Sequence, residues 1–256
     1  MRMGEPGVPT VEQYCADALQ EEEKLGLCGL TASCQLVRGL QKVLDPKGVT
    51  VCTLNLEDEL WTENRPPLPA TPAWLLPAEY AGATPAEKLA RLRAKLAELG
   101  CTAQMVGKLD NLAWLLNLRA MDIECTPYAM AYCFVTEKDA VLFINSERLA
   151  SEAAAELAAC GVRLAGYDEV LSFLAGCTEP QTVLAEPASV NYAVFSALEA
   201  NPAFTVKSLP DPLLPMKGVK NATELAHSRE CHIRDAVAMV RFQKELEERL
   251  EAGEAL

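Results

Sequence analysis

Apolar and polar positions along the middle of the chain alternate in a way that predicts short strands and amphipathic helices. Strand-like runs such as "YAMAYCFVT" and "AVLFIN" stand between segments with three- and four-residue helical spacing. The polar turn "EKD" between these two runs predicts a hairpin. Strands that alternate with helices over residues 80–208 favour a layered α/β domain with a mixed sheet flanked by helices.

Start and stop signals predict where several helices begin and end. Thr84 and Glu87 form a capping-box pattern around Pro85, and Gly100 marks the end of the helix that they open. Ser146 is expected to cap a helix that runs to about Ala159.

Residues 1–64 show the same kind of pattern with fewer elements. A helix follows a cap at Thr10, two strand-like runs ("KLGLCGL" and "GVTVCTL") flank a second helix, and a short helix is expected over 56–61. Two strands make a poor sheet, because an independent sheet usually needs three or more. We therefore expect a partial α/β domain here.

Two proline-rich stretches, "RPPLPATPAWLLP" and "LPDPLLP", divide the chain, because proline is excluded from helix interiors and central strands. We expect a partial domain over 1–64, a connector over 65–79, a complete domain over 80–208, and a linker with one long helix over 209–256. Asn221 and Glu224 form the capping box that opens this last helix.

Composition narrows the class of protein. The chain has 256 residues and a formal net charge of −13, which argues against nucleic acid and anionic membranes as partners. No apolar run reaches the roughly 18 residues of a membrane-spanning helix, and the first residues lack the apolar core of a signal peptide. We expect a cytoplasmic protein. The ten cysteines include no Cys-x-x-Cys pair, which favours reduced core residues over a metal or redox site.

The two histidines do not predict a metal site. His227 and His232 are five residues apart, or about 500° around a helix axis, so they do not share a helix face. The chain also contains none of the common motifs of serine hydrolases, phosphate-binding loops, dinucleotide sites or zinc peptidases. From the residues alone we assign no catalytic residue and no metal ligand.

Arg119 and Asp122 are the candidate site residues. They follow an apolar helix and precede a strand, and ligand sites in α/β sheets often form at such junctions. One interpretation is that they pair with each other or cap the helix. The other is that they line a cleft shared with another domain.

Six stretches, in their order along the chain, resemble the Xaa-Pro aminopeptidases, which are three-domain members of the creatinase/prolidase metallopeptidases. They are "MGEPGVPTVEQY", "LEDELWTENRPPLP", "EYAGATPAEKLARLR", "LDNLAWLLNLRAMDIECTP", "VNYAVFSAL" and "KGVKNATELAHSRECHIRDAVAMVRF". The second holds Trp61, Arg65 and Pro66 of the family's connector. In the last, the residues at matching places are Lys217, Lys220, Asn221, Glu224, Arg229, His232, Arg234 and Asp235. Asn111, Ala120 and Cys125 depart from the family's pattern.

The resemblance implies a fold with a creatinase N-terminal-like domain, preceded by a partial α/β domain and followed by one long helix. It also implies a parent enzyme that removes an N-terminal residue preceding proline, with proline-containing peptides as substrates. The family's catalytic domain binds two divalent metals, usually manganese, through aspartate, histidine and glutamate ligands that no residue here matches. We expect an inactive fragment that lacks this domain and contributes cleft shape and oligomer contacts. The resemblance places Arg119 and Asp122 near the mouth of that cleft.

Two further expectations concern partners. The helix over 221–250 should expose an apolar stripe, which favours self-association or a homo-oligomer. The alternative function is a stand-alone pseudo-enzyme or interaction domain that binds peptides or a full-length subunit. An unrelated α/β protein that binds a small molecule would explain the middle of the chain but not the ordered motifs.

Overall fold

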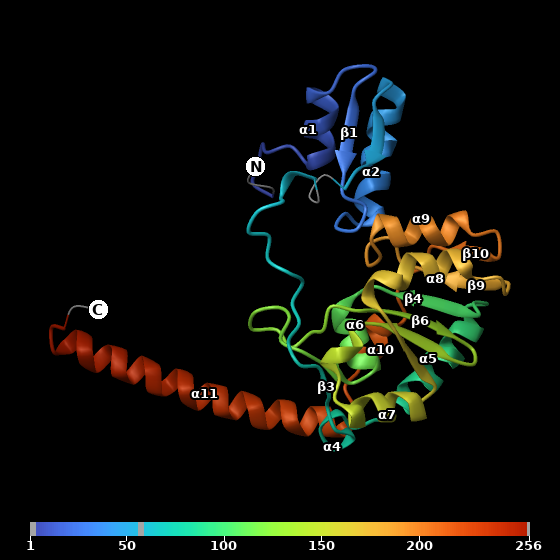
Figure 1. Ribbon diagram of the computed structural model, residues 1–256. Helices are drawn as coiled ribbons and strands as arrows, with labels where there is room; N and C mark the ends of the chain where they lie inside the picture. Colours follow the sequence, from blue (N-terminus) through green and yellow to red (C-terminus); the bar gives the residue numbers. More distant parts are fainter. Residues whose placement is uncertain (1–3, 56–58, 255–256) are drawn as a thin grey trace.

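The computed structural model describes residues 4–55 and 59–254. Figure 1 shows a small N-terminal unit, a larger body built on a sheet, and a long helix that projects from the body. This is the expected α/β fold, with a mixed sheet flanked by helices and followed by one long helix. The expected helix over 56–61 falls partly on residues 56–58, which lie outside the described residues.

The N-terminal unit contains two helices and a pair of parallel strands. Its elements are α1 (Val11–Ala18), β1 (Lys24–Leu27), α2 (Cys34–Leu44), the short 3-10 helix η1 (Asp45–Lys47) and β2 (Thr50–Thr53). The capping box at α1 confirms the prediction of a cap at Thr10. Leu40, Leu44 and Val49 form the centre of a small core of its own.

Backbone hydrogen bonds join the N-terminal unit to the larger body. The amides of Cys34 and Gln35 donate to the carbonyls of Val190 and Pro187, at 3.1 and 2.8 Å. In return, Tyr192 N donates to the carbonyl of Ala32 at 2.9 Å, and Ala193 N donates to that of Gly29 at 2.9 Å. The two units are therefore connected through main-chain groups at the start of α2 and of α9.

A six-stranded sheet forms the body, in the order β10-β9-β4-β6-β7-β8. Five strands are parallel to one another, and β6 runs against its neighbours β4 and β7. The predicted hairpin is β6 and β7, although β6 starts later than the run "YAMAYCFVT". The strands are β4 (Ala103–Val106), β6 (Tyr132–Thr136), β7 (Ala140–Phe143), β8 (Val162–Ala165), β9 (Gln181–Leu184) and β10 (Phe204–Lys207).

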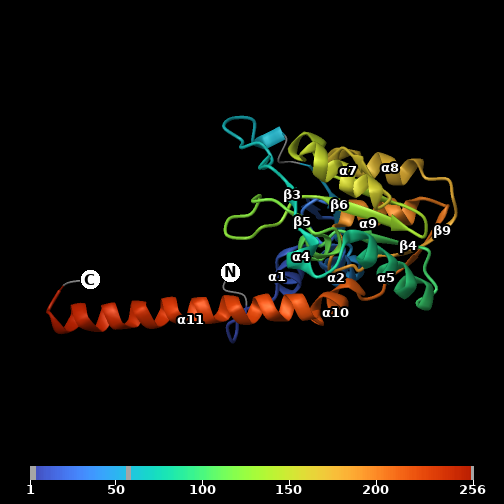
Figure 2. The same ribbon diagram turned by 90° about the horizontal axis from the view of Figure 1, so that it is seen from below.

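Helices cover both faces of this sheet and form two cores (Figures 1 and 2). One core takes leucines from α5 (Pro85–Glu98), α6 (Leu109–Leu115) and α7 (Ser151–Ala159). The other takes apolar residues from α8 (Val170–Gly176) and α9 (Tyr192–Ala200). The capping box at Thr84, with Pro85 in the first turn of α5, is as predicted.

The prediction that Ser146 caps a helix to Ala159 was wrong. Residues Ser146–Arg148 form a separate 3-10 turn, η2, whose N-cap is Asn145. The helix α7 begins only at Ser151, after an extended N-cap residue, Ala150. The break lets Arg148 turn inward, where it is 9% exposed.

The two proline-rich stretches contain more regular structure than predicted. Within the first, β3 (Trp74–Leu75) pairs antiparallel with β5 (Leu118–Arg119), and α4 (Ala78–Ala81) follows the stretch directly. Within the second, α10 (Leu213–Gly218) begins and has Pro215 in its first turn, where the missing amide costs no hydrogen bond. The remaining 3-10 turn is η3 (Tyr167–Glu169).

The last helix, α11, spans Ala222–Glu251 and opens with the predicted capping box of Asn221 and Glu224. Its 30 residues make it about 45 Å long. Its main contacts are with α4, and the rest projects away from the body in both views (Figures 1 and 2). Among the residues that the structure describes, no helix is both long and apolar enough to cross a membrane.

Candidate functional site

Arg119 lies at the end of β5 and closes the end of α6. Its Nη1 donates to the carbonyl of Ala113 at 2.6 Å and to that of Leu118 at 2.9 Å. Ala113 lies in the last turn of α6, where carbonyls lack helical partners. Burial lowers the pKa of the guanidinium, and Tyr128 acts against that shift. Arg119 thus caps a helix, which was one of the two interpretations of this residue.

Asp122 does not pair with Arg119, so that part of the first interpretation was wrong. Its side chain is 0% exposed, and it forms an ion pair with Arg148 from η2. It also accepts hydrogen bonds from the hydroxyl of Thr71 at 2.7 Å and the amide of Met130 at 2.8 Å. Burial alone raises the pKa of Asp122, but the hydrogen bonds from Arg148, Thr71 and Met130 outweigh burial and hold its pKa below the ordinary value.

Asp122 and Arg148 together fix the first connector against the body. Arg148 Nε donates to the carbonyl of Thr71 at 2.8 Å, and Met121 N donates to the Thr71 hydroxyl at 3.0 Å. Sequence reasoning missed both Thr71 and Arg148. They lie 51 and 26 residues from Asp122, and no local spacing rule relates residues so far apart.

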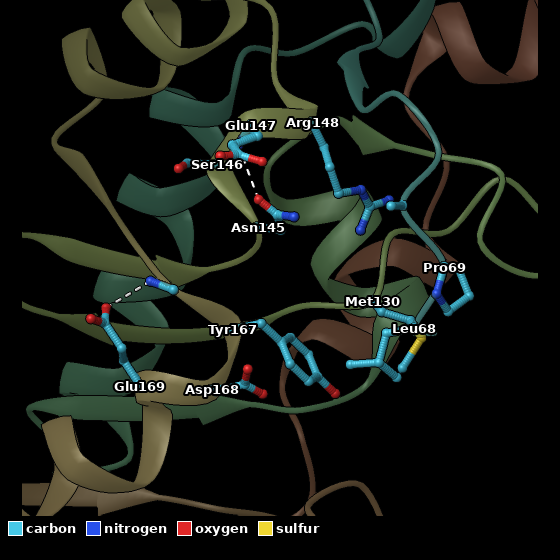
Figure 3. A pocket seen from close by; sticks show the side chains of 12 residues that line it. Leu68, Pro69, Met130, Asn145, Ser146, Glu147, Arg148, Tyr167, Asp168 and Glu169 are labelled. Carbon is cyan, nitrogen blue, oxygen red and sulfur yellow. Dashed lines mark hydrogen bonds between the residues drawn. The ribbon is translucent and has the colours of Figure 1, made fainter. Parts of the chain in front are cut away.

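A recess of about 440 Å³ opens beside this ion pair, at the carboxyl ends of β7 and β8. Figure 3 shows Leu68, Pro69 and Met130 on one side of it and Tyr167 and Asp168, from η3, on another. Ligands of α/β proteins commonly bind at the carboxyl ends of parallel strands. The recess therefore lies at an edge of the sheet where a ligand could bind.

A second recess of about 290 Å³ adjoins the first and shares Met130 and Tyr167 with it. The rings of Tyr132 and Tyr167 stack there at 5.2 Å, and Asn191 Nδ2 donates to the Tyr132 hydroxyl at 2.7 Å. Several polar groups around the two recesses are thus already paired within the protein.

The second linker is held by a buried polar network that includes Asn111. The carboxylate of Asp211 accepts from Gln104 Nε2 at 2.8 Å and from Asn111 Nδ2 at 2.7 Å. The other amide atom, Asn111 Oδ1, accepts from Lys217 Nζ at 2.9 Å, and Lys217 also forms an ion pair with Asp110. An amide both donates and accepts, so it fits between a carboxylate and an ammonium group.

The histidines of α11 do not form a metal site. The ring of His227 lies 5.6 Å from that of Tyr80, and Nδ1 of His232 is 2.8 Å from the carbonyl of Ser228. Across residues 4–55 and 59–254, no three His, Cys, Asp or Glu side chains are arranged to hold a metal ion. The described residues therefore do not fit a two-metal centre.

Beyond its first turns, α11 exposes many large apolar side chains. Ile233, Val237 and Val240 share one face and are 66, 45 and 63% exposed. Met239 and Leu250, 57 and 56% exposed, lie on an adjoining side of the helix. Exposed apolar surface of this extent is typical of contact sites.

Comparison with known proteins gives consistent matches. A family model for the creatinase/prolidase N-terminal domain matches residues 64–224. A probable Xaa-Pro aminopeptidase P of Coprinopsis cinerea is 32% identical over 267 residues, which cover 99% of this chain and 43% of the relative. Aminopeptidase P2 of Arabidopsis thaliana is 29% identical over 278 residues, which cover 97% of this chain and 39% of the relative.

Among solved structures, an X-prolyl aminopeptidase from Caenorhabditis elegans, described as a cytosolic enzyme with a di-nuclear active site, matches with a TM-score of 0.88. The two are 30% identical, and the match covers 98% of this chain and 42% of that one. This chain thus spans about two fifths of the length of the relatives that it matches.

Proposed function

Because the chain belongs to the creatinase/prolidase N-terminal domain family, we propose that it is the non-catalytic N-terminal portion of an Xaa-Pro aminopeptidase. The observation that carries this proposal is the match along 98% of the chain to 42% of the C. elegans enzyme. The parent protein would remove an N-terminal residue that precedes proline. The proposed division is a partial domain over 1–64, a connector over 65–79, a domain over 80–208, and a linker with α11 over 209–256.

This chain is inactive by itself in our proposal. The two divalent metals, which we propose to be manganese, belong to the rest of the parent enzyme. The described residues of this chain do not fit a two-metal centre. The chain contributes the shape of the cleft and contacts between subunits. A cytosolic location agrees with that described for the C. elegans enzyme.

The activity assay is a direct test of this proposal. The chain alone and the chain extended by the catalytic portion of a relative are supplied with manganese and an Xaa-Pro peptide. We expect turnover only from the extended protein. Turnover by the chain alone, if it disappears with a chelator, would contradict the proposal.

Within this function, Arg119 and Asp122 have different proposed roles. Arg119 is half-buried, and part of its surface can face a substrate at the cleft mouth. The carboxylate of Asp122 is fully buried, so it acts as a positioning residue that holds the connector and Arg148 at the recess. In the extended enzyme, Arg119→Ala should change the ratio of kcat/KM between long and short Xaa-Pro peptides. Arg163→Ala, which removes an exposed arginine paired with Asp139, should leave the ratio unchanged.

The exposed apolar side chains of α11 favour a second candidate function. A stand-alone interaction domain would use this surface to bind peptides or a full-length subunit. Calorimetric titration of the chain with proline-containing peptides, and co-purification with a full-length relative, distinguish the two functions. Tight binding in either experiment, without activity in the extended protein, would favour the interaction domain.

A further inference from the structure

Lys88 is a buried ammonium group on α5 with neutral partners. Its side chain is 1% exposed, and Nζ donates to the carbonyl of Trp114 at 2.9 Å and to Asn117 Oδ1 at 2.6 Å. Nζ also lies 4.7 Å from the centre of the Trp114 ring, a cation–π distance. No salt bridge of Lys88 is present among the described residues.

Trp114 connects this lysine to the first turn of α11. Its indole Nε1 donates to Glu224 Oε1 at 3.2 Å. The other oxygen of Glu224 accepts from Asn221 N at 2.8 Å and closes the capping box. Asn221 Nδ2 donates in turn to the carbonyl of Ala81, at 2.9 Å. One carboxylate therefore both caps α11 and attaches it to α6.

Gly82 allows α4 and α11 to come this close. Its φ is +70°, and a side chain there would overlap the amide of Asn221. The missing side chain at Gly82 therefore leaves room for Asn221 to reach the carbonyl of Ala81.

The charges around Lys88 are unbalanced. Burial is the largest influence and lowers the pKa of Lys88 to about 8. Glu224 acts in the opposite direction, and Arg119 on β5 and Arg91 on α5 lower the pKa further. Tyr80 of α4 and His227 of α11 face each other at the same joint between α4 and α11. Lys88, 1% exposed, thus interacts with one carboxylate and two guanidinium groups.

We propose that the charge on Lys88 controls how firmly the first turn of α11 is held against α6. When Lys88 is protonated, its positive charge attracts the carboxylate of Glu224 toward the Trp114 indole. When Lys88 is neutral, Glu224 no longer has a buried positive charge nearby, where screening by water is weakest. The cation–π contact between Lys88 and the Trp114 ring is lost as well. The joint is then looser.

Two measurements on the purified chain test the proposal. With 5-fluorotryptophan incorporated, the fluorine resonance of Trp114 should titrate near pH 8, while those of Trp61 and Trp74 serve as internal references. Hydrogen exchange of the first-turn amides of α11, corrected for base catalysis, should show protection that falls roughly fivefold from pH 7 to pH 9.5.

Four variants make the result decisive. Lys88→Arg keeps the charge, so protection should stay high at both pH values, and Lys88→Met should give low protection at both. Glu224→Gln removes the carboxylate charge, so the Trp114 resonance should still titrate while protection no longer responds to pH. His227→Gln should keep the full response. A response that persists in Lys88→Met, or disappears in His227→Gln, would overturn the proposal. If Lys88→Met does not fold, Lys88→Arg decides: a normal pH response in that variant would also overturn it.

Discussion

The indole nitrogen of Trp114 donates a hydrogen bond to Glu224, which is 110 residues away in the sequence. The bond joins α6, inside the body, to the first turn of the projecting helix. Because Glu224 also closes the capping box, this one contact affects both the formation of α11 and its direction.

Replacing Trp114 by phenylalanine should weaken this joint. The substitution leaves Glu224 without its indole donor, and it also reduces the area of the aromatic ring that contacts Lys88. We expect the free energy of unfolding to fall by about 1–2 kcal/mol, measured by urea denaturation. Trp74→Phe is the matched control, because Trp74 is 41% exposed, and it should change stability by less than about 0.5 kcal/mol.

Breaking the Asp122–Arg148 ion pair should strongly lower the free energy of unfolding. Asp122→Asn leaves the guanidinium of Arg148 buried without its counter-charge, at a cost of about 3–5 kcal/mol in unfolding free energy. Arg163→Gln breaks an exposed pair, with side chains 63 and 40% exposed, and should cost less than about 1 kcal/mol. Equal effects of the two substitutions would argue against a structural role for Asp122.

Lys88 should make the protein more stable in alkaline solution. Its pKa is about 8 in the folded chain, against an ordinary lysine value of 10.5, so the unfolded chain binds more protons between these limits. The contribution of Lys88 to the unfolding free energy therefore rises with pH through this window, by up to about 3 kcal/mol. Denaturation at several pH values, compared with Lys88→Met, isolates this contribution. A difference between the two proteins that is constant with pH would contradict it.

The apolar surface of α11 should promote self-association. Ile233→Glu combined with Val240→Glu places two charges on this surface and should shift the light-scattering mass toward the monomer. The control is Ala238→Glu combined with Arg241→Gln, which changes the net charge by the same amount on the polar side of the helix. This control should leave the light-scattering mass unchanged. A chain that is monomeric before any substitution, and binds no apolar dye, would count against the prediction.

Sequence reasoning predicted best the features that depend on neighbouring residues. The capping boxes at Thr84 and Asn221 formed because their partners lie three residues away. The family resemblance, drawn from six ordered stretches, is confirmed by the match over residues 64–224. The domain boundaries stay predictions, and so does the place of Arg119 and Asp122 at a cleft mouth.

What the sequence did not reveal depends on distant partners. Ser146 and Asn145 can both cap a helix turn, and the position of the break before α7 follows from burying Arg148 against Asp122. The two-residue strands β3 and β5 exist because they pair with each other, with partners 43 and 45 residues apart, and neither is long enough to show a pattern. A capping rule or a periodicity over a few residues contains no information on such pairs.

The main-chain bonds between the N-terminal unit and α9 have a consequence for evolution. Cys34, Gln35, Tyr192 and Ala193 all contribute amide groups, which are present whatever side chain stands there, unless it is proline. The contact between the N-terminal unit and α9 can therefore be kept while the side chains change. Relatives can share this arrangement even where their sequences are no longer recognisably similar. Proline at Tyr192 would break a bond that alanine would leave intact.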